Sequence, residues 1–172
     1  MSYQEKRTIV MILTGAAVLA AYCIYAFGGS QAGIAAAGDL KYWARTILIF
    51  IGIGIGATIV IQIVFHILLS IGTAISKKIQ DPNFDEKTIE KTIEKTIELE
   101  MVDDEMHKLI ELKSTRIGFF ITGFGFVLGL VSLLLDYSPV VMLNILFISA
   151  SVGSLVEGFT QLYYYRRGIQ HA

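Results

Sequence analysis

Four long apolar stretches restrict the possible folds of this chain more than any other feature. They run over residues 8–27, 46–75, 117–135 and 139–165. A helix needs about 20 apolar residues to cross the hydrocarbon layer of a bilayer. Backbone groups in lipid must find their hydrogen bonds within the protein, which favours helices. The sequence therefore predicts an all-α integral membrane protein, a four-helix bundle with the lipid bilayer as its environment.

The composition agrees with a membrane protein. Hydrophobic residues make up 54% of the chain and charged residues only 17%, against about 25% charged residues in a soluble domain. No basic stripe indicates a nucleic-acid partner, and none is predicted. Cys23 is the only cysteine, which excludes an intramolecular disulfide and a cysteine zinc cluster. The first apolar stretch is longer than the apolar part of a secretory signal, so we expect it to be retained as a span.

The distribution of basic residues predicts the topology. Of the 14 Lys and Arg residues, all except Lys41 and Arg45 fall on one side of a four-span arrangement. Because cytoplasmic loops are rich in Lys and Arg, we expect a multi-pass protein of the cell membrane with both termini in the cytoplasm. The chain then divides into a first pair of spans (1–76), a cytoplasmic segment (77–116) and a second transmembrane hairpin (117–172).

A tetrapeptide repeat, E-K-T-I, occupies the cytoplasmic segment over residues 86–98. Four residues turn a helix by about 400°, so the isoleucines form one slowly winding apolar stripe. The segment is expected to be a long helix between the second and third spans. Because so narrow a stripe cannot hold a lone helix in water, we expect a homodimer or other homo-oligomer, another protein partner, or contact with the membrane surface. The predicted association stripe is Ile89, Ile93 and Ile97.

The C-terminal part also resembles a known group. The run from Asp104 to Arg116 reads D-E-M-H-K-L-I-E-L-K-S-T-R, and the chain later contains Y-Y-Y-R-R-G. This is similar to small bacterial and archaeal membrane proteins of uncharacterised function that read D-E-R-D-K-L-I-E-L-K-x-x-R before a hydrophobic hairpin and Y-Y-Y-R-R-G after it. The chain departs from that pattern at Met106 and His107. The resemblance covers roughly the last 70 residues, and it implies four spans and no activity.

Polar residues recur along one face of two spans. Their spacings of three, four and seven place each set on one side of its helix. Glu157 and His66 lie at similar expected depths, so a contact between them is possible, and such a pair could relay protons or bind a cation. The alternatives are an ordinary interhelical hydrogen bond from His66 and a partly hydrated Glu157 near the inner interface. The stripes would then line a narrow hydrated path or hold helices together. The sets are Thr58, Gln62, His66, Ser70 and Thr73, and Asn144, Ser151, Ser154, Glu157 and Gln161.

The third span carries a seam of small residues. Small side chains let membrane helices approach closely, so the seam predicts tight packing within the bundle or across a homodimer. It consists of Gly118, Thr122, Gly125, Gly129 and Ser132.

The remaining candidate is a metal site. Asp103, His107 and Glu111 are four residues apart on the expected cytoplasmic helix, and carboxylates with an imidazole suit a transition metal. A solvated acidic surface is the plainer interpretation. The sequence has no catalytic triad, phosphate-binding loop or His-Glu-x-x-His motif, and no cofactor is predicted. The favoured function is therefore a non-enzymatic interaction or regulatory module. The alternatives are a small proton or cation transporter or channel and, less favoured, a metal-dependent membrane enzyme.

Overall fold

The structure is a computed structural model that describes residues 3–28, 38–80 and 105–167. These residues form four helices, α1 (Tyr3–Phe27), α3 (Leu40–Gln80), α5 (Glu105–Leu134) and α6 (Pro139–Arg167). All four are long and apolar enough to cross a membrane. The expected all-helical fold with four membrane-length helices is therefore confirmed for the described part of the chain.

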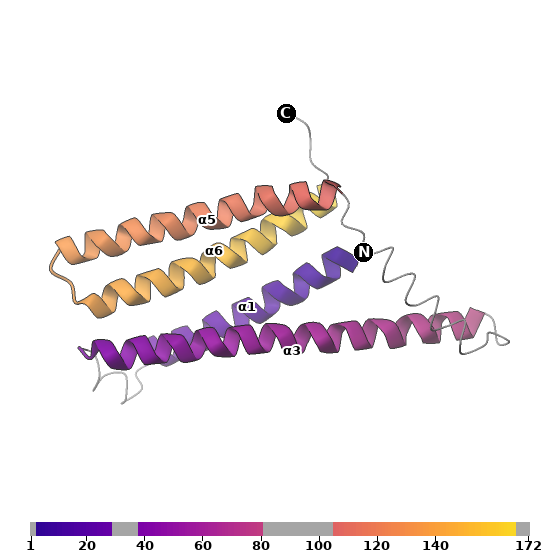
Figure 1. The fold of residues 1–172 in the computed structure, drawn as a ribbon, viewed down its shortest axis with the longest axis horizontal. Coiled ribbons are helices and arrows are strands. Elements are labelled where there is room, and N and C mark those ends of the chain that lie inside the picture. The colour runs from indigo at the N-terminus through magenta and orange to yellow at the C-terminus, as the bar shows by residue number, and fades with distance from the viewer. Residues whose placement is uncertain (1–2, 29–37, 81–104, 168–172) are drawn as a thin grey trace.

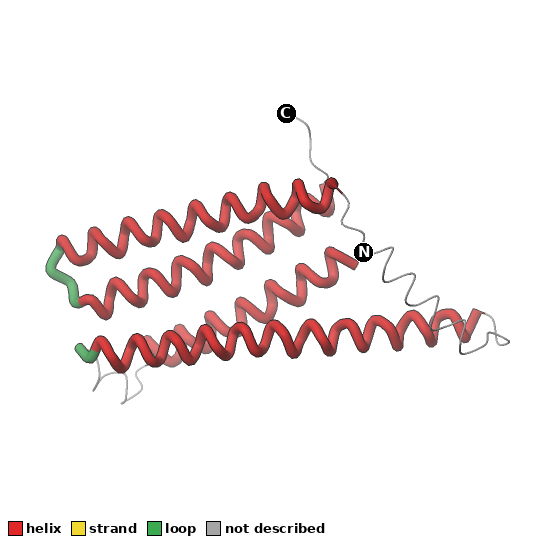
Figure 2. Tube along the Cα trace, in the orientation of Figure 1, coloured by secondary structure: helices red, strands yellow, loops and turns green. Residues whose placement is uncertain are grey.

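Successive helices run in opposite directions, so the bundle has two ends (Figure 1). Tyr3 and Arg167 lie at one of them, which we call the terminal end. The other, the loop end, carries the connection between α5 and α6. Helix α5 packs on α6, α1 packs on α6 and α3, and α3 contacts α6. Figure 2 shows that all the described secondary structure is helical.

Helix α3 is longer than the sequence predicts. It contains 41 residues, about 60 Å of helix at 1.5 Å per residue. It begins at Leu40 because Asp39 caps it: the Asp39 carboxylate accepts hydrogen bonds from the backbone N–H groups of Lys41 (2.9 Å) and Tyr42 (3.2 Å). Such a cap satisfies amides that have no partner inside the helix. The helix passes through Gly52, Gly54 and Gly56 without interruption, and Figure 1 shows it as a nearly straight rod.

The expected separate cytoplasmic helix over residues 77–116 is not supported. Residues 77–80 are the last turn of α3, and residues 105–116 are the first turns of α5, which runs on into the third span. Helix runs on into the span because no proline lies between Glu105 and Leu134 to interrupt it. Ile89, Ile93 and Ile97 lie outside the described residues, as does Asp103.

The turn between α5 and α6 has a defined backbone structure. Asp136 adopts a left-handed conformation with φ of 60°. Its N–H bonds the carbonyl of Leu133, and the N–H of Tyr137 bonds the carbonyl of Ser132, which together form a Schellman motif that closes α5. Pro139 then begins α6, where its missing N–H has no cost. The short turn holds the two helices antiparallel.

Candidate functional site

The small-residue seam of α5 faces α6. Gly118 lies so close to Gly153 that a Cβ built at Gly118 would be 2.9 Å from the Gly153 carbonyl oxygen. A Cβ built at Gly153 would be 2.7 Å from both the Gly118 oxygen and the Thr122 hydroxyl oxygen. Such distances are shorter than van der Waals contact, so the two backbones touch only because both residues are glycine. This is the close approach that small residues permit in membrane helices.

The seam continues toward the loop end. A Cβ built at Gly125 would be 2.1 Å from the Cβ of Ser149, and one at Gly129 would be 3.2 Å from Met142. The hydroxyl of Thr122 donates to the Gly118 carbonyl (3.0 Å), and that of buried Ser132 donates to the Gly129 carbonyl (2.7 Å). All five predicted seam residues thus lie on one face of α5, and their hydroxyls bond their own helix.

Two polar pairs close the same interface near the terminal end. The hydroxyl of Thr115 on α5 donates to Oε1 of Glu157 on α6 at 2.7 Å. Further toward the terminal end, the Tyr165 hydroxyl hydrogen-bonds Nδ1 of His107, and their rings stack with centroids 5.7 Å apart. These pairs keep the register of the glycine contacts. The α5–α6 contact therefore extends from His107 to the turn.

The side chain of Glu157 on α6 makes its contacts with α5. Its Oε2 and Cβ also lie about 3 Å from the position of a Cβ at Gly118, so the side chain is directed at α5. Its partner Thr115 is adjacent to Arg116 and two residues from Lys113, where the charged part of α5 meets the apolar part. A carboxylate at this level can reach water, which lowers the cost of keeping it in a membrane helix.

The remaining polar candidates are distributed over several interfaces. His66 on α3 lies edge-on to Phe65 with ring centroids 6.2 Å apart, and Gln62 and Gln161 are half-buried. The contacts that hold Glu157 come from α5, so they do not bring it to His66. Asn144 belongs to the α1–α6 contact instead. Thr58 of the α3 set and Ser151 and Ser154 of the α6 set line one space between the helices, so the two predicted stripes meet there in part.

Asn144 meets Tyr22, a partner that the sequence did not indicate. The Tyr22 hydroxyl donates to Oδ1 of Asn144 at 2.7 Å, and the Asn144 amide donates to the Val140 carbonyl at 2.8 Å. Tyr22 is fully buried, with its ring 5.1 Å from that of Phe50 on α3 and 4.4 Å from that of Phe147 on α6. Tyr22 thus links three helices. Asn144 itself was the sequence signal for such a contact, because a polar residue in a span needs a hydrogen-bond partner.

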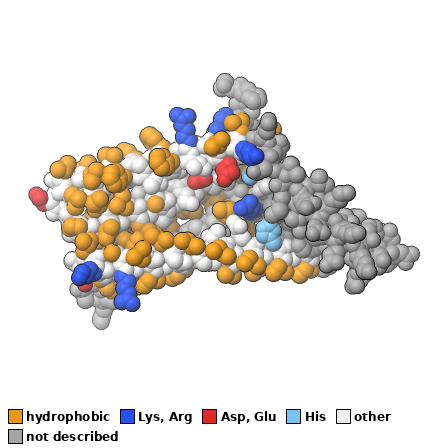
Figure 3. Space-filling view, in the orientation of Figure 1, with side chains coloured by type: hydrophobic (Ala, Val, Ile, Leu, Met, Phe, Trp, Pro, Cys, Tyr) orange, Lys and Arg blue, Asp and Glu red, His pale blue; other side chains and the backbone are white. Residues whose placement is uncertain are grey.

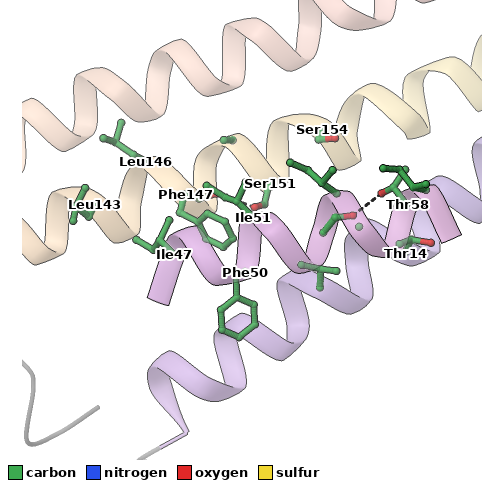
Figure 4. A pocket seen from close by; sticks show the side chains of 16 residues that line it. Thr14, Ile47, Phe50, Ile51, Thr58, Leu143, Leu146, Phe147, Ser151 and Ser154 are labelled. Carbon is green, nitrogen blue, oxygen red and sulfur yellow. Dashed lines mark hydrogen bonds between the residues drawn. The ribbon is translucent and has the colours of Figure 1, made fainter. Parts of the chain in front are cut away.

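Beside this contact, residues of α1, α3 and α6 line an open cavity of about 750 Å³ (Figure 4). Its wall is largely apolar, with Phe50, Ile51 and Phe147 pointing toward the space between the helices. Three hydroxyls in the wall donate to carbonyls of their own helices: Thr14 to Val10, Thr58 to Gly54 and Ser151 to Phe147. Ser154 is a fourth hydroxyl-bearing residue of the wall, which is otherwise largely apolar.

The outer surface is apolar between two charged ends. Figure 3 shows hydrophobic side chains over the middle of the visible face, with Lys and Arg side chains gathered toward both ends. Large residues such as Phe119 (77% exposed) and Leu48 (67% exposed) stand on this surface. A surface of this kind is stable only in contact with lipid or with other apolar helices.

The metal candidates are only partly described. His107 is engaged with Tyr165, Glu111 is exposed one turn further along α5, and Asp103 lies outside the described residues. Among residues 3–28, 38–80 and 105–167, no three His, Cys, Asp or Glu side chains are grouped as a metal site would require. The metal site stays a prediction.

Comparison with known proteins adds no relative. No family model, no curated protein and no solved structure matches this chain.

Proposed function

We propose that this protein is a non-enzymatic interaction or regulatory module of the cell membrane. In this proposal the α5–α6 hairpin is a fixed scaffold, and α3 with the segment after it associates with a second copy of the chain or with another protein. The resemblance of the C-terminal part to other small membrane proteins implies no activity, so the proposal rests on how the four helices pack.

The exposure of α3 is the observation that carries the proposal. Its most apolar stretch contains no buried residue, although α3 is the longest of the four described helices. Ile63 (55% exposed) and Leu68 (62% exposed) are typical of its surface. Moving apolar surface from lipid to a protein interface gains no hydrophobic free energy, but close packing between helices still stabilises their association. A long helix with so few neighbours in its own chain is the natural place for a partner.

The basic residues support cytoplasmic termini. The terminal end carries Lys6, Arg7, Lys77, Lys78, Lys108, Lys113, Arg116, Arg166 and Arg167 among the described residues, and the loop end carries Lys41 and Arg45. By the positive-inside rule the terminal end faces the cytoplasm. Residues 81–104, between α3 and α5, then belong to the cytoplasmic side, where the isoleucine stripe is available for association.

Cysteine crosslinking in native membranes tests the proposal. Cys23 is first replaced by Ser, and single cysteines are then placed at Ile93 or Ile97, with Lys95 as the matched control between them. We expect disulfide-linked dimers, or a captured partner, from both isoleucine positions and far less from Lys95. Monomers at all three positions would contradict the proposed association.

Thiol labelling in sealed vesicles tests the orientation. Single cysteines at Lys91 and at Gln170 are expected to react from the same side of the membrane, and one at Tyr137 from the opposite side. Lys91 and Gln170 on opposite sides would overturn the four-span topology.

A proton or cation transporter has less support. Asn144 is bonded to Tyr22 on α1 and Glu157 to Thr115 on α5, and the space between α3 and α6 is largely apolar. The test is flux in liposomes containing the purified protein. Flux that Glu157→Gln abolishes would favour the transporter over the interaction module.

A further inference from the structure

We propose that the cavity between α1, α3 and α6 binds one acyl chain of an anionic phospholipid, and that Lys41 and Arg45 at the loop end contact its phosphate. This site goes beyond the proposed interaction function and does not depend on it.

The chemistry of the cavity wall selects an apolar occupant. Of the four hydroxyl-bearing residues in the wall, Thr14, Thr58 and Ser151 donate their hydroxyl hydrogens to carbonyls of their own helices, and Ser154 is the fourth. Water in the cavity would find few polar partners, and a buried water usually needs two to four. The cavity is open to its surroundings and has a volume of about 750 Å³, so molecules of the surrounding medium can enter it. All of its lining residues lie within the four membrane-length helices, where hydrocarbon is the available material.

The length of the cavity matches one leaflet. On α3 its lining extends from Ile47 to Ile59, which is about 18 Å along the helix axis. Half of the roughly 30 Å hydrocarbon layer is about 15 Å. Ile47 lies one turn inside Trp43 and Tyr42, residues of the kind that mark the membrane interface. The cavity thus begins near the interface at the loop end and reaches about the middle of the membrane, as an acyl chain does.

Charge at the loop end indicates the headgroup. Lys41 and Arg45 are exposed, and they precede the cavity lining on α3. Lys41 is 18 residues, or five full turns, before Ile59, so it lies on the same side of α3 as this edge of the cavity. The neighbouring carboxylate of Asp39 is occupied by the backbone N–H groups of Lys41 and Tyr42. Two cations at the loop end, from which the cavity lining on α3 begins, complement the phosphate of a lipid whose chain enters from that end.

Trp43 provides a probe for this lipid. It is the only tryptophan, it is 5% exposed, and it lies one turn before Ile47 on the same face of α3. Lipid that merely surrounds the protein has little access to it. The experiment uses the full chain in phosphatidylcholine vesicles and adds phosphatidylglycerol or phosphatidylcholine brominated near the carbonyl end of the acyl chain, which quenches tryptophan on contact. A control protein with Trp43→Phe and Leu48→Trp reports surrounding lipid, because Leu48 is 67% exposed.

We expect saturable quenching of Trp43, half-maximal at a mole fraction of brominated phosphatidylglycerol at least fivefold lower than that of brominated phosphatidylcholine. Lys41→Gln should remove most of this preference without touching the cavity. Gly54→Leu, which fills the cavity, should abolish the quenching. Gly52→Leu is its matched control, because a side chain at Gly52 meets nothing within 4 Å.

Three results would overturn the proposal. They are equal quenching by the two headgroups, absence of quenching by either (as when a helix of a second copy fills the cavity), and quenching that Gly54→Leu leaves unchanged in protein that retains its helical content. The Lys41→Gln result decides the matter if the Gly54→Leu protein does not fold.

Discussion

The α5–α6 hairpin and helix α3 are built from similar residues but pack very differently. Both contain several glycines among large apolar side chains. In the hairpin, Gly118 and Gly153 bring two backbones into contact. In α3, a Cβ at Gly52 or Gly56 would meet nothing within 4 Å, and one at Gly54 would make only an ordinary contact with Val18. Glycine therefore permits close packing but does not by itself produce it.

A matching partner explains the difference. Gly52 and Gly56 are four apart and share a face of α3, but a Cβ at either meets nothing within 4 Å. The small residues of α5 recur every three or four positions and share a face. They also meet small residues, because Ser149 and Gly153 are four apart on α6. A seam requires a matching seam on the partner helix.

Substituting alanine for the glycines at the α5–α6 contact should have the largest effect on stability. Gly125→Ala places a Cβ 2.1 Å from that of Ser149, and Gly153→Ala places one 2.7 Å from the Gly118 oxygen. The obstacles are a backbone atom and a Cβ, which cannot rotate away. We expect each change to lower the free energy of unfolding in detergent by about 1–3 kcal/mol, as overpacking does.

Gly123→Ala is the matched control, since its Cβ would meet nothing within 4 Å. We expect its effect to stay within about 0.5 kcal/mol. Equal losses from Gly123→Ala and Gly125→Ala would show that the seam is not the site of close packing.

Removing one hydroxyl should have an intermediate effect on the looser side of the bundle. Tyr22→Phe keeps the ring contacts with Phe50 and Phe147 but removes the hydrogen bond to Asn144. We expect a loss of about 0.6–1.7 kcal/mol, the average and the upper end for such bonds in membrane proteins. Thermal unfolding in detergent measures it. Tyr137→Phe, in the exposed turn, is the control, and equal losses from both would refute the assigned role of Tyr22.

The Thr115–Glu157 pair is expected to contribute less. Thr115→Val removes the donor and should cost about 0.6 kcal/mol. Glu157→Gln keeps an oxygen that can accept from Thr115, so its cost should be smaller. Denaturant unfolding of the two variants compares them. A larger loss from Glu157→Gln would indicate that the charge itself stabilises the hairpin.

The smallest expected change is a gain. Asp136 holds a left-handed conformation that glycine adopts without strain. Asp136→Gly should raise the free energy of unfolding by only a few tenths of a kcal/mol, because Asp tolerates this conformation better than most residues, and Asp136→Val should lower it. A gain from both substitutions in chemical unfolding would contradict the Schellman turn.

The sequence was sufficient for the elements but not for their partners. Apolar length predicted the number of spans, and the spacing of Gly118, Gly125 and Gly129 predicted a packing face. It could not say whether that face meets α6 or a second copy, because the choice depends on the three-dimensional position of Gly153. The pairing of His66 with Glu157 was suggested by depth alone, and depth does not determine which way a helix is rotated.

The sequence also predicted the helix boundaries poorly. The second span begins earlier than apolarity suggests because the Asp39 cap brings Lys41, Tyr42 and Trp43 into α3. The third begins in a charged region because no proline interrupts the helix between Glu105 and Leu134. Apolarity reports where lipid begins, whereas capping and propensity decide where a helix begins.

Distance measurements between spin labels test the central contrast most directly. In a Cys23→Ser background, labels at Phe120 and Phe159 report the α5–α6 distance, and labels at Ile63 and Phe159 report the α3–α6 distance; all three positions are exposed. A fixed hairpin beside a loosely held α3 predicts a narrow distribution for the first pair and a clearly broader one for the second. Equally narrow distributions would contradict this account of the molecule.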